Sequence, residues 1–80
     1  MIYTTLDGQS YDTDRQLSEA ERHVLQKLVI WRKVGLSPRE FQRRRDEALA
    51  KGWNNQGPVQ ESAIMAAISR DLLARLRAGS

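Results

Sequence analysis

Three stretches of the chain repeat hydrophobic residues at spacings of three and four, which is the pattern of one buried face of an α-helix. They span residues 18–34, 37–51 and 58–77. The residues that carry the stripes are Val24, Leu25, Leu28 and Trp31 in the first stretch, Phe41, Ala48 and Leu49 in the second, and Ile64, Ile68 and Leu72 in the third. The pattern therefore predicts three amphipathic helices joined by short loops.

Capping residues set the ends of these helices. Ser18 with Glu21 three positions later has the form of a capping box, and Ser37, followed by Pro38 and Glu40, repeats it. Gly35 and Gly52 are expected to end the first two helices because glycine readily adopts the left-handed conformation of a helix C-cap. Pro58 is expected to open the third helix.

Residues Ile2 to Leu6 and Gln9 to Thr13 are runs compatible with β-strands, and they flank Asp7-Gly8, a dipeptide typical of a two-residue hairpin turn. Pairing outward from that turn sets Leu6 opposite Gln9, Thr4 opposite Tyr11 and Ile2 opposite Thr13. Ile2, Leu6 and Tyr11 would then share the face that packs on the helices. The sequence thus predicts a mainly α fold, a three-helix domain with a short N-terminal β-hairpin.

Eighty residues form one domain, taken as residues 1–80, and a core of this size supplies roughly 3–5 kcal/mol of stability. Extra burial through a second copy of the chain is therefore expected. Residues 63–68 are apolar on all sides, and small alanines there allow helices to approach closely. This segment predicts a homodimer that associates through Ile64, Ile68 and Leu72.

Charge is distributed unevenly along the chain. Residues 1–21 hold five acids against one base, whereas residues 22–45 hold eight bases against one acid. The basic block predicts an anionic partner, and an acidic protein is the first candidate because the arm of this chain or of its twin is itself acidic. The side chains expected to bind it are Lys33, Arg39, Arg43, Arg44 and Trp53.

The arginines of residues 37–51 also have a purely structural interpretation. Glu40 with Arg44, Arg43 with Glu47 and Glu47 with Lys51 lie four residues apart, where helix side chains meet in pairs that contribute about 0.2–0.5 kcal/mol each. Arg45 falls on the inward side of the same helix. It is expected to reach water or an acid, because burying it alone would cost several kcal/mol.

Residues 31–49 resemble a DNA-binding helix-turn-helix, which supplies the alternative function, a small DNA-binding regulator. Gly35 at the turn, Leu36 and Ser37 after it and Phe41 fit that pattern. Trp31 stands where a small residue is expected, and Arg44 stands where an apolar one is. Arginines on the helix over 37–51 would contact phosphates or bases.

Catalytic and metal-binding patterns are absent from the sequence. With no cysteine and one histidine, His23, the chain lacks the ligands of a zinc site, and no glycine-rich phosphate loop occurs. The sequence predicts no enzyme activity, no cofactor and no membrane span, and its lack of cysteine favours a cytoplasmic location. The function expected is that of a non-enzymatic protein-interaction or adaptor module.

Overall fold

The computed structural model describes residues 1–79 and confirms a mainly α fold with a short N-terminal hairpin. Strands β1 (Ile2–Thr4) and β2 (Ser10–Asp12) come first, followed by a short helix α1 (Thr13–Gln16). Three longer helices follow, α2 (Glu19–Lys33), α3 (Pro38–Lys51) and α4 (Ala63–Arg77), with a 3₁₀ turn η1 (Trp53–Asn55) after α3. None of the described helices is long and apolar enough to cross a membrane.

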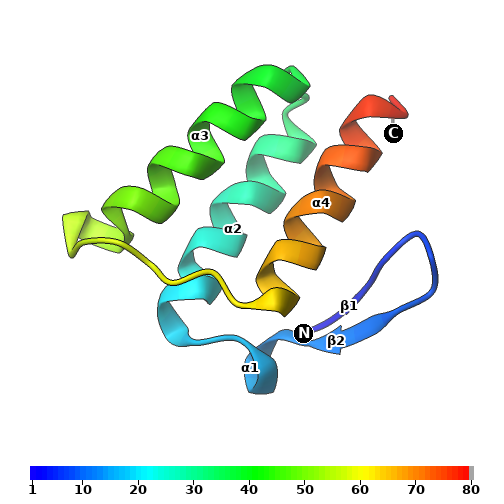
Figure 1. The fold of residues 1–80 in the computed structure, drawn as a ribbon. Helices are drawn as coiled ribbons and strands as arrows, with labels where there is room; N and C mark the ends of the chain where they lie inside the picture. The colour runs from blue at the N-terminus through cyan, green and yellow to red at the C-terminus, as the bar shows by residue number, and fades with distance from the viewer. Residues whose placement is uncertain (80) are drawn as a thin grey trace.

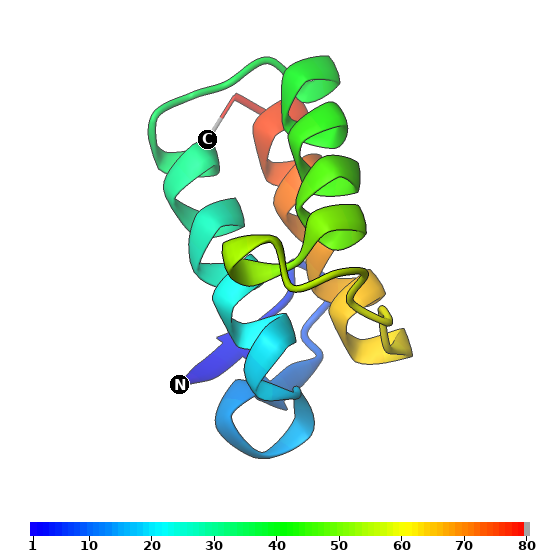
Figure 2. The same cartoon turned by 90° about the vertical axis from the view of Figure 1, so that its left-hand side faces the viewer.

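The three long helices pack side by side as a bundle, with the hairpin and α1 at one end of α2 and along α4 (Figures 1 and 2). The predicted stripes meet in one core, whose most deeply buried members are Val24, Leu28, Phe41, Met65 and Ile68. Ile68 and Leu72 are 0% and 3% exposed within a single chain, and Ile64 is half-buried. A second copy therefore has no access to Ile68 or Leu72 unless the bundle rearranges.

Serine side chains cap all three long helices. Ser18, Ser37 and Ser62 each accept a hydrogen bond from the backbone N–H three residues later. The capping box at Ser18 is confirmed, since Glu21 Oε1 accepts the Ser18 N–H at 3.0 Å. The second predicted box is incomplete, because the Glu40 carboxylate binds arginines instead of the Ser37 N–H.

Glu21 joins two helices. While Oε1 caps α2, Oε2 accepts the backbone N–H of Ser62 at 2.9 Å, and Ser62 is the N-cap of α4. Burial alone would raise the pKa of Glu21, but the hydrogen bonds from Ser18 and Ser62 outweigh it and hold the pKa below its ordinary value. One buried carboxylate thus fixes where both helices begin.

The predicted hairpin register is wrong by one residue. Ile2 pairs with Asp12, Tyr3 with Tyr11 and Thr4 with Ser10. The turn holds three residues, Leu6-Asp7-Gly8, because Thr5 N–H donates to the Gln9 carbonyl and Gly8 adopts a φ of 91°. A one-residue slip exchanges the two faces of a strand, so Ile2 and Leu6 are 63% and 62% exposed while Tyr3 packs inward.

Two other boundaries differ from the prediction. The arm ends at Asp12, whose side chain caps α1, a helix that the sequence pattern did not indicate. The third long helix begins at Ala63 instead of Pro58, and residues 57–62 form a connection without helix or strand (Figure 1). Val59 N–H donates to the Leu49 carbonyl at 2.7 Å in this segment. In the same segment, Oε2 of Glu61 lies 3.4 Å from Nη1 of Arg45. Arg45 therefore pairs with an acid, as expected for a basic residue on the inward side of the helix.

Asp71 fastens the hairpin to α4. Its carboxylate accepts the Tyr3 hydroxyl at 2.6 Å, the Leu6 N–H at 2.8 Å and Arg75 Nε at 2.8 Å. Arg75 also donates to the Thr4 carbonyl at 3.0 Å. Side chains of α4 therefore occupy backbone groups at the free edge of β1 that another strand would otherwise use.

Candidate functional site

The arginines of α3 are held by acids of the same helix. Arg43 donates to Glu40 at 2.6 Å and to Glu47 at 3.3 Å, Arg44 donates to Glu40 at 2.9 Å, and Lys51 donates to Glu47 at 3.1 Å. All three predicted pairs at four-residue spacing are thus confirmed. Hydrogen bonds from Arg43 and Arg44 lower the pKa of Glu40 to about 2, and the bond from Lys51 lowers the pKa of Glu47.

Beside these pairs, α2, α3 and the η1 loop enclose a groove of about 540 Å³. We name it the α2–α3 groove. It is lined by Lys27 and Trp31 from α2, by Arg43, Arg44, Glu47, Ala48 and Lys51 from α3, and by Gly52, Asn54 and Asn55 from the loop. Four cations, one acid, an indole and two amides therefore face the same space.

Two features of the lining distinguish the α2–α3 groove from an ordinary helix surface. The guanidinium of Arg44 lies 5.7 Å from the centre of the Trp31 ring, a cation–π distance that fixes both side chains at the groove wall. Within residues 1–79, no carboxylate lies at ion-pairing distance from the Lys27 ammonium. Lys27 therefore offers its charge to a ligand without breaking an internal pair.

The loop at the end of the α2–α3 groove has a constrained backbone. Asn54 and Asn55 have φ values of 54° and 58°, in the left-handed region that residues other than glycine rarely adopt. Gly52 has a φ of 71° and is buried so tightly that a Cβ would overlap the carbonyl oxygen of Gly57. Such strained residues concentrate at functional sites, where the surrounding structure holds them in place.

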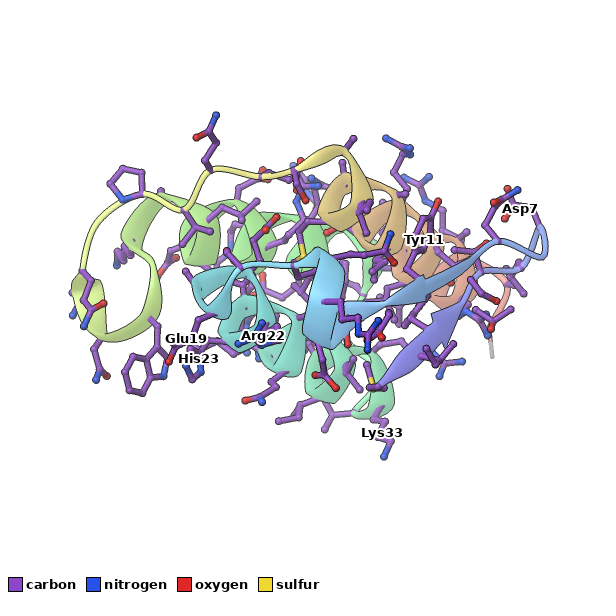
Figure 3. The ribbon with its side chains drawn as sticks, turned by 90° about the horizontal axis from the view of Figure 1, so that it is seen from below. Asp7, Tyr11, Glu19, Arg22, His23 and Lys33 are labelled. Atoms are coloured by element: carbon purple, nitrogen blue, oxygen red, sulfur yellow. The ribbon has the colours of Figure 1, made fainter. Side chains whose placement is uncertain are left out.

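Trp53 anchors this loop on α2. Its ring stacks on His23 with centroids 4.4 Å apart and planes inclined by 13°, and 41% of the residue remains exposed. The stacking partner of Trp53 therefore belongs to α2 and not to α3, the helix that precedes Trp53 in the chain. Figure 3 places His23 beside Glu19 at this end of the helix, where Nε2 of His23 and Oε1 of Glu19 are 3.8 Å apart.

Of the predicted partner-binding residues, the structure brings Arg43 and Arg44 into the α2–α3 groove. Lys33 and Arg39 are exposed but do not line it, and Trp53 supports the loop at its rim. Lys27, Trp31, Lys51, Asn54 and Asn55 were missed. Lys27 and Trp31 lie four residues apart beside the core stripe of α2, a spacing that could have indicated a shared wall.

The arrangement of α2 and α3 bears on the helix-turn-helix alternative. Figures 1 and 2 show the two helices running alongside each other in opposite directions. A DNA-binding helix-turn-helix crosses its helices at about 90–120° so that the second helix projects into the major groove. The hairpin of α2 and α3 does not present α3 in that way.

In residues 1–79, no cluster of three histidine or acidic side chains could hold a metal ion.

No protein-family model, no curated protein and no solved structure matches this chain.

Proposed function

We propose that this protein is a non-enzymatic interaction module whose α2–α3 groove binds an acidic segment of another protein. The observation that carries the proposal is the convergence of four cations, Trp31 and two asparagine amides on one groove. Acidic side chains of a bound segment would meet Lys27 and Arg44, and its apolar parts would lie against Trp31.

The charges inside the α2–α3 groove favour an anionic ligand. Lys27, Arg43, Arg44 and Lys51 line it, against Glu47 in the lining and Glu40 beside it. The two acids partly neutralise the arginines and leave a modest positive excess. A peptide carboxylate replaces part of this internal pairing at low cost, because Arg43 and Lys51 are 61% and 60% exposed at their side chains.

Duplex DNA fits this groove less well than an acidic peptide. Glu40 and Glu47 would lie against the phosphates of a duplex, and like charges in contact oppose binding. The aligned packing of α2 and α3 also keeps α3 within the bundle surface. Binding of DNA in place of peptide is therefore the outcome that would overturn the proposal.

Intrinsic fluorescence gives a direct test. A Trp53→Phe variant leaves Trp31 as the single indole, since the chain has two tryptophans. Titration of this variant with a glutamate-rich peptide at about 50 mM salt should change Trp31 emission, and affinity should fall as salt rises. A lysine-rich peptide of equal length should leave the emission unchanged.

Charge reversal in the same background locates the site. Lys27→Glu should weaken binding of the glutamate-rich peptide at least about 10-fold, or ~1.4 kcal/mol. Arg70→Glu is the matched control, because Arg70 is an exposed base on α4 outside the groove. Equal losses in the two variants, or tight binding of a random DNA duplex without binding of the peptide, would overturn the proposal.

A further inference from the structure

A second surface, formed by α2 and the N-terminus, exposes apolar side chains beside a hollow. Met1 and Ile30 are 58% and 56% exposed, and they border a hollow of about 370 Å³. Leu25 and Val29 form apolar parts of its lining, and Thr13, Asp14, Arg22 and Gln26 form the polar part. We name this the α2 outer face. It lies on the side of α2 away from the core residues Val24 and Leu28.

Five residues follow one line along the α2 outer face. Glu19, Arg22, Gln26, Ile30 and Lys33 are spaced three or four apart, so their side chains share one side of the helix. The line is symmetric about Gln26. Arg22 and Ile30 are each four residues from Gln26, and Glu19 and Lys33 are each seven residues from it. Figure 3 shows Glu19 and Lys33 at opposite ends of the helix, with Arg22 between them.

We infer that the α2 outer face binds a second copy of this chain, with the two α2 helices antiparallel and a two-fold axis beside Gln26. In this arrangement Ile30 enters the hollow of the partner next to Arg22 and Gln26, and the partner's Ile30 does the same in return. Glu19 of each copy pairs with Lys33 of the other, which gives two ion pairs. Such self-complementarity is what a two-fold interface requires, because each contact occurs in both directions.

The charges at the ends of α2 are available for this role. Among the described residues, no acid lies within ion-pairing distance of Lys33, and the Glu19 side chain is 82% exposed beside His23. The acidic start and basic end of α2 attract each other only when two copies run antiparallel. A parallel pair would bring like charges together.

Two other routes to a dimer are obstructed among the described residues. Ile68 and Leu72, which the sequence predicted at the interface, are covered by the chain's own helices. At the free edge of the hairpin, Asp71 accepts the Leu6 N–H and Arg75 donates to the Thr4 carbonyl. We therefore place the dimer interface on α2 instead of α4. This interface does not depend on the ligand proposed for the α2–α3 groove.

Cysteine cross-linking tests the two-fold axis directly, because the natural chain contains no cysteine. Under mild oxidation, Gln26→Cys should form a disulfide-linked dimer within minutes, since a residue on the axis meets its own copy. Gln60→Cys, at an exposed site outside the α2 outer face, is the matched control and should cross-link at least about 10-fold more slowly. Equal cross-linking rates would overturn the inference.

A charge exchange separates a specific interface from a general effect of charge. In sedimentation equilibrium, Glu19→Lys and Lys33→Glu should each weaken the dimer, and the double variant should restore it because the pairs re-form in reverse. Ile30→Asp should abolish association, whereas Leu6→Asp, at an equally exposed apolar residue of the hairpin turn, should leave it unchanged. A chain that remains monomeric at high concentration, or a double variant that is no better than the singles, would overturn the inference.

Discussion

Asp71 is the residue through which the hairpin is held on the bundle, and Asp71→Ala tests that role. The substitution leaves the Tyr3 hydroxyl, the Leu6 N–H and Arg75 without their shared acceptor. Removing one partner of a buried ion pair costs about 3–5 kcal/mol. We expect about 3 kcal/mol, at the low end of that range, because Arg75 is 25% exposed at its side chain and keeps its bond to the Thr4 carbonyl.

A loss of that size is comparable to the whole stability of roughly 3–5 kcal/mol expected for a domain this small. In thermal unfolding followed by circular dichroism, it corresponds to a fall in Tm of about 12–24 °C. Asp46→Ala is the matched control, because the Asp46 side chain is 59% exposed on α3. If Asp71→Ala lowers Tm no more than Asp46→Ala does, the hairpin is not held by this carboxylate and the reasoning fails.

Three further predictions concern stability. Glu21→Gln should cost about 2 kcal/mol in urea unfolding, because one of its two caps loses its acceptor, whereas Glu19→Gln in the same helical turn should change little. Gly52→Ala should destabilise the protein by more than about 2 kcal/mol, and Gly35→Ala by only about 1 kcal/mol. Both glycines have a positive φ, but only at Gly52 would the new Cβ collide with the Gly57 carbonyl, so similar losses in a thermal melt would contradict this prediction. The pKa values of Asp71 and Glu21 lie below their ordinary 3.8 and 4.5, so the stability they contribute is present above those values and is lost as pH falls through the lower folded-state pKa values. The urea midpoint should therefore be level near neutral pH and fall below about pH 4, and a midpoint that stays level down to pH 2 would refute the assignment.

Local chemistry explains what could be predicted about the helices. Ser18, Ser37 and the two glycines at 35 and 52 act on their own neighbours in sequence, so their effect on helix boundaries depends little on the rest of the fold. The ion pairs of α3 are predictable for the same reason, since helix geometry alone brings their partners together.

Contacts between distant residues explain what was missed. Asp7-Gly8 suits both a two-residue and a three-residue turn, and the register that the chain adopts is the one that sends Tyr3 toward Asp71, 68 residues away. Pro58 is permitted in a first helical turn, but α4 begins only after Ser62. Ser62 is its N-cap, and the Ser62 N–H donates to Glu21. Both choices are made by tertiary partners that local sequence does not reveal.

The candidate site divides in the same way. Arg43 and Arg44 were identified because they belong to a conspicuous run of charge, whereas Lys27 and Asn54 join them only through the packing of α2, α3 and the η1 loop. Trp31 was assigned to the core from its place in the hydrophobic stripe. In the fold it is half-buried, with its ring at the wall of the groove beneath Arg44.

Amide chemical-shift mapping tests the central claim, that the α2–α3 groove is a binding site for acidic segments. On addition of a glutamate-rich peptide to ¹⁵N-labelled protein, we expect the largest shifts at Lys27, Arg44 and Asn54 and at the indole N–H of Trp31. Shifts that are absent, or that spread evenly over exposed bases such as Arg39, Arg70 and Arg77, would contradict the account.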